Sequence, residues 1–451
     1  MGRNPCFSFF LLFTIIFQVA AGDHHPVIGS QREALEIVIG DGGDTPALPH
    51  EYEDCAPPPP PPELCTPPPP PPCLPPNIER DYNATQKFKE AIKTDPKGVT
   101  KSWNRADRNV CNFEGFTCAE RPDTGVLSVA AANFNGYNLG GPNFQLKDFL
   151  DQLLDLSIFH ANSNNFAGIL PNEIGTQNLN FLFELDLSNN KYTGGFPISV
   201  LSATNLTFLD IRYNSFSGPV PGEVFNLDLD VLLLNNNQFS QQLPDNIGST
   251  PALYLTFANN YFTGPIPSSI GSAKYLREVL FLNNNFTGCL PYEIGFLNES
   301  TLLDVSRNNL TGPIPHSFAC LAKIQILNLA SNEFYGPVPE MVCKLPYLQN
   351  LSLSGNYFTQ VGPVCRKLIE LKTLDVSNNC ILDLPNQKSA KMCKEFFSER
   401  EKCPNEKSLT IVPCMENYRS TMTMFDQKPT FVAATPPISY DALSPRNSFR
   451  F

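Results

Sequence analysis

Residues 206–221 read Leu206-Thr-Phe-Leu209-Asp-Ile211-Arg-Tyr-Asn214-Ser-Phe216-Ser-Gly218-Pro-Val-Pro221. The same pattern returns in residues 324–339, around Asn332. The shared template is L-x-x-L-x-L-x-x-N-x-L/F-x-G-x-x-P. Its asparagine recurs every 23 to 26 residues, at Asn164, Asn190, Asn214, Asn237, Asn260, Asn284, Asn308, Asn332, Asn356 and Asn379.

A repeat of this length lies in the range of ~20–29 residues that is typical of leucine-rich repeats. The apolar positions three and five residues before each asparagine alternate with polar ones, as in a strand that buries one face. We therefore predict an α/β solenoid of about 10–11 plant-type coils, with a parallel sheet on the concave face and cysteine-stapled caps. We expect the ten asparagines to turn inward and to bond backbone groups, forming a structural ladder without a role in function.

The composition excludes some classes of function. The 451 residues carry a net charge of −12, which is the wrong sign for a nucleic-acid-binding protein. The sequence holds none of the common catalytic motifs, so we predict no enzyme activity, no cofactor and no metal. An acidic surface instead favours cationic partners.

The chain divides into six segments. Arg3, the apolar run from Phe7 to Val19 and the small residues Ala20 and Ala21 predict a signal peptide over residues 1–21. Two runs of six prolines make residues 22–77 a low-complexity segment with a polyproline II rod. The remaining expectations are an N-terminal cap over residues 78–124, the repeats over 125–385, a cysteine-rich C-terminal cap over 386–414 and a disordered tail over 415–451. Since no later stretch could span a membrane, we expect a secreted protein.

Fourteen cysteines also indicate an oxidising compartment. We expect disulfides among ten of them: Cys111, Cys118, Cys289, Cys320, Cys343, Cys365, Cys380, Cys393, Cys403 and Cys414. Cys111 and Cys118 are expected to pair locally. Cys320 and Cys343 stand at nearly equal phase on adjacent coils, within reach of each other, while Cys365 competes for Cys343. Loss of Cys6 with the signal leaves an odd number, so a free thiol or a disulfide-linked dimer through Cys55, Cys65 or Cys73 is expected.

Sequons for N-glycosylation occur at six positions. They are Asn83, Asn205, Asn285, Asn298, Asn309 and Asn350. Asn350 falls on a strand of the predicted sheet, where a glycan would obstruct the concave face.

The concave face carries a candidate ligand-binding patch. The positions four and six residues before the motif asparagine point outward, and on neighbouring coils they combine acidic and aromatic side chains. The candidate residues are Glu184, Asp186, Phe208, Asp210, Arg212, Tyr213 and Tyr254. Exposed aromatic residues favour binding, and acidic groups select a cationic ligand. The alternative is the ordinary solubilising charge of a strand face.

Residues 78 to 415 resemble the leucine-rich-repeat head of plant LRR-extensins. The resemblance is carried by Asn143-Phe144-Gln145-Leu146, by Phe159-His160-Ala161-Asn162-Ser163-Asn164, by Gly288-Cys289-Leu-Pro291 and by the exit motifs Pro363-Val364-Cys365 and Cys393-Lys-Glu-Phe-Phe. The family's serine-led proline repeats do not follow the head, since 37 residues remain after Cys414, so an extensin-less relative is expected.

The resemblance implies a cell-wall or apoplastic protein that binds basic rapid alkalinization factor peptides, intersects with wall-sensing receptor kinases and influences wall formation and cell growth. Cell-wall polysaccharide is a further possible partner. Two alternatives stay open. One is an inhibitor of wall-degrading enzymes that resembles polygalacturonase-inhibiting protein, and the other is a structural hydroxyproline-rich wall glycoprotein.

Overall fold

The computed structural model describes residues 74–141, 146–170, 180–399, 402–404 and 407–414. The predicted signal peptide, most of the proline-rich segment and the predicted tail over 415–451 lie outside these residues. So do Cys55, Cys65 and Cys73, on which the expected free thiol or intermolecular disulfide depends.

The N-terminal cap begins with helix α1 (Pro76–Ala91), followed by two short 3₁₀ helices, η1 (Val99–Lys101) and η2 (Val110–Asn112). Its centre is Trp103, which is fully buried and donates its indole N–H to the carbonyl oxygen of Glu114 at 2.9 Å. Cys111 and Cys118 are joined by a disulfide. The cap thus closes the first coil with aromatic packing and one covalent link.

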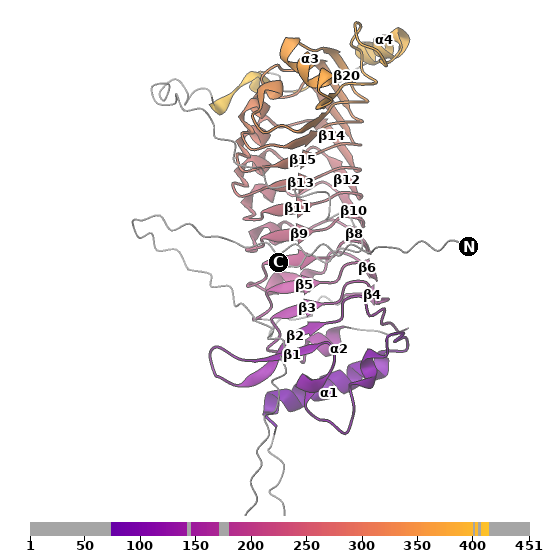
Figure 1. Ribbon diagram of the computed structural model, residues 1–451, viewed down its shortest axis with the longest axis vertical. Coiled ribbons are helices and arrows are strands. Elements are labelled where there is room, and N and C mark those ends of the chain that lie inside the picture. The colour runs from indigo at the N-terminus through magenta and orange to yellow at the C-terminus, as the bar shows by residue number, and fades with distance from the viewer. Residues whose placement is uncertain (1–73, 142–145, 171–179, 400–401, 405–406, 415–451) are drawn as a thin grey trace, which may run out of the picture. The chain divides into compact units, whose positions relative to one another are not determined.

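The main sheet has twelve strands, in the order β1-β2-β3-β5-β7-β9-β11-β13-β15-β17-β19-β21. Only β1 (Phe116–Glu120) and β2 (Leu127–Asn133) pair antiparallel; every later neighbour is parallel, which confirms the predicted solenoid (Figure 1). The later strands are β3 (Ile158–His160), β5 (Glu184–Asp186), β7 (Phe208–Asp210), β9 (Val231–Leu233), β11 (Tyr254–Thr256), β13 (Glu278–Leu280), β15 (Leu302–Asp304), β17 (Ile326–Asn328), β19 (Asn350–Ser352) and β21 (Leu374–Asp375).

A second parallel sheet of nine strands, which the sequence analysis missed, runs beside the first along the solenoid (Figure 1). Each of its strands follows a motif asparagine, and seven of the nine end near the glycine of the Gly-x-x-Pro segment, whereas β10 and β20 end at Gln241 and Gln360. They are β4 (Ala167–Ile169), β6 (Lys191–Gly194), β8 (Ser215–Gly218), β10 (Gln238–Gln241), β12 (Tyr261–Gly264), β14 (Asn285–Cys289), β16 (Asn309–Gly312), β18 (Glu333–Pro337) and β20 (Tyr357–Gln360).

Short helices complete the coils. α2 (Lys147–Leu150) lies in an early coil, and the later coils use 3₁₀ helices, which are η3 (Ile198–Ser202), η4 (Gly222–Asn226), η5 (Ile247–Ser249), η6 (Ser268–Ser272), η7 (Tyr292–Phe296), η8 (His316–Cys320) and η9 (Val342–Lys344). Their close packing explains Gly248, Gly271 and Gly295, where an added Cβ would meet the backbone of the next coil.

The motif asparagines tie each coil to the one before it. Asn260 donates from Nδ2 to the carbonyl oxygens of Phe257 and Leu234, both at 3.0 Å, and its Oδ1 accepts the N–H of Phe239 at 3.0 Å. All ten asparagines make this set of bonds. Six are buried, and Asn190, Asn214, Asn284 and Asn308 are half-buried.

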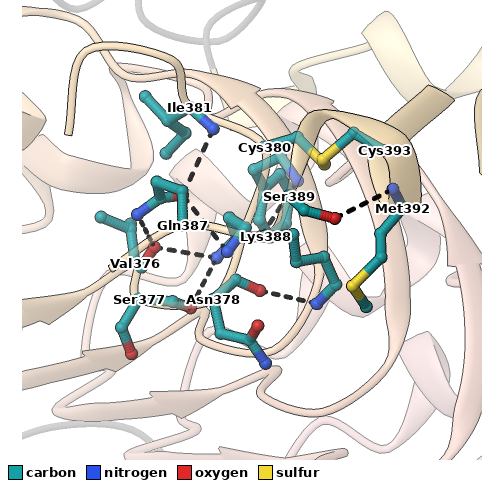
Figure 2. The surroundings of a disulfide bond; sticks show 12 residues. Val376, Ser377, Asn378, Cys380, Ile381, Gln387, Lys388, Ser389, Met392 and Cys393 are labelled. Carbon is teal, nitrogen blue, oxygen red and sulfur yellow. Dashed lines mark hydrogen bonds between the residues drawn. A yellow bond between two sulfur atoms is a disulfide. The ribbon is translucent and has the colours of Figure 1, made fainter. Parts of the chain in front are cut away.

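The C-terminal end is closed by α3 (Pro363–Glu370), α4 (Ala390–Glu399) and η10 (Ser408–Thr410). Figure 2 shows the disulfide between Cys380 and Cys393 beside Gln387. The Gln387 side chain donates to the carbonyl oxygen of Val376 at 3.1 Å and accepts the N–H groups of Asn379 and Ile381, each at 3.2 Å. A single amide therefore satisfies backbone groups that the missing next coil would otherwise bond.

The described cysteines form five disulfides, and Cys343 pairs with the competing Cys365 rather than with Cys320. Cys320 pairs with Cys414, and Cys343 pairs with Cys365. Cys403 reaches back to Cys289, 114 residues earlier. The exit chain therefore turns back along the solenoid as a strap, defined here as the described residues among 402–414. Because the strap brings a distant partner to Cys320, equal phase on adjacent coils does not decide its pairing.

Candidate functional site: the outer face of the main sheet

Two rows of outward side chains define the candidate site, named here the binding face. Strand register aligns them across six neighbouring strands from β5 to β15. The first row holds Glu184, Phe208, Val231, Tyr254, Glu278 and Leu302, and the second holds Asp186, Asp210, Leu233, Thr256, Leu280 and Asp304. With strands ~4.8 Å apart, five intervals span roughly 24 Å.

The middle of the binding face is apolar. Phe208, Val231 and Leu233 form a buried cluster with Tyr254 packed against it. A second buried cluster holds Leu280 and Leu302. Both are separate from the core inside the coils. The members of both clusters are buried, and the half-buried Tyr254 is the residue of the first cluster that a ligand could contact directly.

Carboxylates lie at both ends of this apolar centre, and of these only Glu184 is more than 7% exposed. Glu184 and Asp186 lie on β5 at one end, and Glu278 and Asp304 lie on β13 and β15 at the other. Glu184 is half-buried, and its Oε2 lies 2.8 Å from Nε2 of His160 on β3.

The expectation that Asp186 and Asp210 are exposed acidic contacts was wrong. The two residues are 3% and 1% exposed. Asp186 Oδ1 accepts the N–H of Ser188 at 2.9 Å, and Asp210 Oδ1 accepts the N–H of Arg212 at 3.1 Å. The side chain therefore caps the turn that leads from the strand to the motif asparagine.

The same cap recurs along the sheet. Asp304 accepts the N–H of Ser306 at 2.8 Å, and Asp375 accepts the N–H of Ser377 at 2.9 Å. The spacing Asp-x-Ser, four and two residues before the asparagine, is the sequence signal that could have revealed this role.

Arg212 is also buried, contrary to its assignment as an exposed ligand contact. Its Nε lies 2.9 Å from Asp210 Oδ2, and neither side chain is more than 1% exposed. Burial raises the pKa of Asp210 well above its ordinary value, and the nearby Asp186 raises it further, while Arg212 opposes both effects. The pair is consequently a buried feature of β7 and its turn rather than a free charge.

The aromatic candidates are also less exposed than the sequence analysis expected. Phe208 is buried in the apolar centre. Tyr254 and Tyr213 are half-buried, and burial raises the pKa of both phenols. Tyr213 lies beyond the end of β7 with a positive φ of 52°, so it borders the two rows without belonging to them.

The six sequon asparagines are all exposed: Asn83, Asn205, Asn285, Asn298, Asn309 and Asn350. Asn350 lies on β19, one strand beyond β17. Glycosylation at any of them stays a prediction.

Family models match three stretches of the chain. The model "Leucine rich repeat N-terminal domain" matches residues 78–119, which form most of the cap. The model "Leucine Rich Repeat" matches residues 205–227 and 301–321.

The curated relatives are extensin-like. Leucine-rich repeat extensin-like protein 2 of Arabidopsis thaliana is 38% identical over 112 residues, 25% of this chain and 13% of the relative. Extensin-like protein 1 of the same plant is 37% identical over 114 residues, 25% of this chain and 14% of the relative. Extensin-like protein 4 is 40% identical over 99 residues, 22% of this chain and 19% of the relative. The matches therefore span less than a fifth of each relative.

Two solved structures share the fold. One is the LRR ectodomain of the plant membrane receptor kinase GASSHO1/SCHENGEN3 from Arabidopsis thaliana, in complex with CASPARIAN STRIP INTEGRITY FACTOR 2, with a TM-score of 0.52 and 23% identity over 66% of this chain and 44% of that chain. The other is a plant ice-binding protein, with a TM-score of 0.54 and 22% identity over 69% of this chain and 98% of that chain. No helix in the described ranges is long and apolar enough to cross a membrane. The chain has a leucine-rich-repeat fold, and the curated relatives named above are leucine-rich-repeat extensin-like proteins.

Proposed function

We propose that the chain is an extracellular binding protein that captures a basic, cysteine-rich signalling peptide of the rapid alkalinization factor type on its binding face. Through this capture it influences cell-wall formation and cell growth, with a wall-sensing receptor kinase as a further partner. The observation that carries the proposal is the apolar centre between two acidic ends, held in register on adjacent strands.

Each part of the binding face has a physical task. The apolar centre around Phe208, Val231 and Tyr254 provides burial, which governs how slowly a ligand leaves. Glu184, which is half-buried at the β5 end, attracts basic groups and sets the orientation of the ligand. Because Asp186 and Asp210 are buried, the electrostatic contribution expected of the predicted patch rests on Glu184.

Five disulfides in the described part of the chain agree with an oxidising compartment. The similar receptor ectodomain was solved in complex with CASPARIAN STRIP INTEGRITY FACTOR 2, which supports a ligand-binding use of the fold. The extensin-like relatives support a place in the cell wall.

The purified chain should be tested as bait against three panels: basic cysteine-rich secreted peptides, wall-degrading hydrolases, and wall polysaccharides. We expect retention of the basic peptides, weakened by salt because charge contributes to the encounter. Retention of a hydrolase with loss of its activity would instead identify an enzyme inhibitor. Retention of polysaccharide alone would favour a structural wall glycoprotein.

A further inference from the structure

We propose that the N-terminal cap and the turn after β2 form a second binding site, which takes a polysaccharide that carries carboxylate groups on its sugar rings. The site is named here the lysine patch and consists of Lys93, Lys97, Lys101 and Tyr137. It goes beyond the proposed function, because it shares no residue with the binding face and takes a ligand of the opposite charge.

The cap is a basic part of an acidic protein. Residues 76–110 hold eight lysines and arginines and five acidic residues, a net charge of +3, whereas the whole chain carries −12. Since the field of the whole molecule repels anions, an anionic ligand can bind only where unpaired positive charge is gathered locally.

All five carboxylates of this segment already have partners in the structure. The pairs are Glu79 with Arg108, Asp81 with Arg80, Glu90 with Arg105, Asp95 with Val99 and Thr100, and Asp107 with Asn109 and Asn112. The positive charge that remains on this segment therefore comes from lysines.

The three lysines of the lysine patch are exposed. None of them forms an ion pair within the part of the chain that the structure describes. Lys93 donates from Nζ to the carbonyl oxygen of Glu90 at 2.7 Å, a neutral acceptor that leaves the charge of the ammonium group unbalanced. These charges are available to a ligand.

The fold brings the lysine-bearing loop against the turn that holds Tyr137. The N–H of Lys93 donates to the carbonyl oxygen of Gly140 at 2.7 Å. The loop that follows α1 therefore runs along residues 136–140. Lys97 Nζ lies over the ring of Tyr137, 5.7 Å from its centroid. Backbone hydrogen bonds thus fix the lysines beside an aromatic ring.

The surface over this turn is open. Gly136 has a φ of +68°, and an added Cβ there would have only Lys97 Nζ within 4 Å, at 3.9 Å. On the neighbouring loop, Lys101 Nζ lies 3.2 Å from the position of an added Cβ on Gly98. A ligand can therefore approach the backbone of the turn closely while ammonium groups border it.

The residue types favour a carboxylated sugar over a phosphate surface. Arginine forks suit phosphate, but Arg105 and Arg108 are held in ion pairs. Lysine is a compact point charge that suits single carboxylates spaced along a polymer. Glu114 hydrogen-bonds the hydroxyl of Tyr137 and so orients the ring, whose face can stack on the apolar face of a sugar. The exposed amide of Asn138 can bond sugar hydroxyls.

The contact is tested with polygalacturonate labelled at its reducing end, titrated by fluorescence anisotropy with the full chain at about pH 6, where carboxyl groups are ionised. The triple variant Lys93→Gln, Lys97→Gln and Lys101→Gln should bind the polymer about tenfold more weakly, a loss of 1.4 kcal/mol. Its binding should also depend less on salt, because three charged contacts are removed. An unchanged denaturant curve shows that the variant is folded.

A matched control removes the same charge elsewhere. The triple variant Lys274→Gln, Lys344→Gln and Lys367→Gln changes three exposed lysines of later coils and α3, and it should bind polygalacturonate like the unchanged chain. An equal loss of affinity in both triple variants would overturn the proposal, as would no binding of polygalacturonate to the unchanged chain.

Three further probes identify the class of ligand. We expect no binding of fully methyl-esterified polygalacturonate, at least tenfold weaker binding of polyglutamate, and no binding of phosphatidylserine vesicles. Equal binding of the esterified polymer would refute the role of charge. Equal binding of polyglutamate would refute the preference for a sugar, and binding of the vesicles in place of polygalacturonate would identify a phosphate surface instead.

Discussion

At the scale of single residues, the motif asparagines satisfy buried backbone groups of two adjacent coils. In Asn260→Ala, the carbonyl oxygens of Phe257 and Leu234 and the N–H of Phe239 lose their side-chain partner. Because these groups are buried, we expect the free energy of unfolding to fall by roughly 1–3 kcal/mol. Denaturant titration measures this loss, with Gln238→Ala at an exposed position on β10 as the control. A loss no larger than that of the control would contradict the role given to the ladder.

Among single residues, the sequence predicted the role of the motif asparagines but not that of the charged candidate residues. The ten asparagines could be identified because their spacing is regular and their bonds are local to two adjacent coils. Arg212 was misjudged because its ion pair with Asp210 is buried. Asp186 and Asp210 were misjudged because an acidic residue on a strand was taken as a surface charge. Its oxygen instead accepts a backbone N–H two residues later.

At the scale of elements, α1 docks on the first coils through a buried carboxylate. Asp81 is fully buried, pairs with Arg80 at 2.7 Å, and accepts the N–H of Val129 at 3.4 Å. Burial raises the pKa of Asp81 from 3.8 to about 6, and Arg80 only partly offsets it. The folded state therefore holds this proton more tightly than the unfolded state.

Because the pKa of Asp81 is higher in the folded state than in the unfolded state, its contribution to stability decreases as the pH rises. The contribution of Asp81 to stability is intact below pH 4 and falls as the pH rises through about 6, by about 3 kcal/mol in total. Asp81→Asn should flatten the stability profile between these values, whereas Asp123→Asn, at an exposed position, should leave that part of the slope unchanged. Denaturant titrations across this pH range measure the slope of the unfolding free energy against pH. An unchanged slope in Asp81→Asn would refute the assignment.

The strap is the second element with a clear test. Gly312 has a φ of +94°, and an added Cβ would collide with Cys403 Sγ and lie 3.2 Å from Cys289 Sγ. Gly336 has a φ of +85° but no atom closer than 4.0 Å to such a Cβ. Both Gly→Ala changes strain the backbone, yet only Gly312→Ala should hinder the disulfide between Cys289 and Cys403. Thiol labelling with mass spectrometry should find these two cysteines free in that variant alone. Their full oxidation there would contradict the packing of the strap.

At the scale of the whole molecule, the main sheet was predictable and the second sheet and strap were not. The repeat fixes the stacking of coils, and the parallel register follows from it. The strands of the second sheet contain a single apolar position of the template, after the motif asparagine, which is too few for a clear alternating pattern. The strap depends on disulfides that span 94 and 114 residues, and no spacing along the chain encodes such partners.

The binding face is likewise a property of the whole molecule, because its residues come from six successive strands. Its apolar centre needs Phe208, Val231 and Tyr254 in register, which repeat spacing predicts. Which carboxylates act at its ends depends on burial and hydrogen bonds. Only the three-dimensional structure supplies these.

The most direct test of the central claim is surface plasmon resonance of a basic cysteine-rich peptide on the full chain and on its variants, at two salt concentrations. Tyr254→Ala should mainly raise the dissociation rate, by about tenfold for a loss of 1.4 kcal/mol. Glu184→Gln should lower the association rate and flatten its salt dependence. Tyr261→Ala on β12 should change neither rate. Unchanged rates in both face variants, with the peptide still bound, would place the ligand elsewhere and contradict the account.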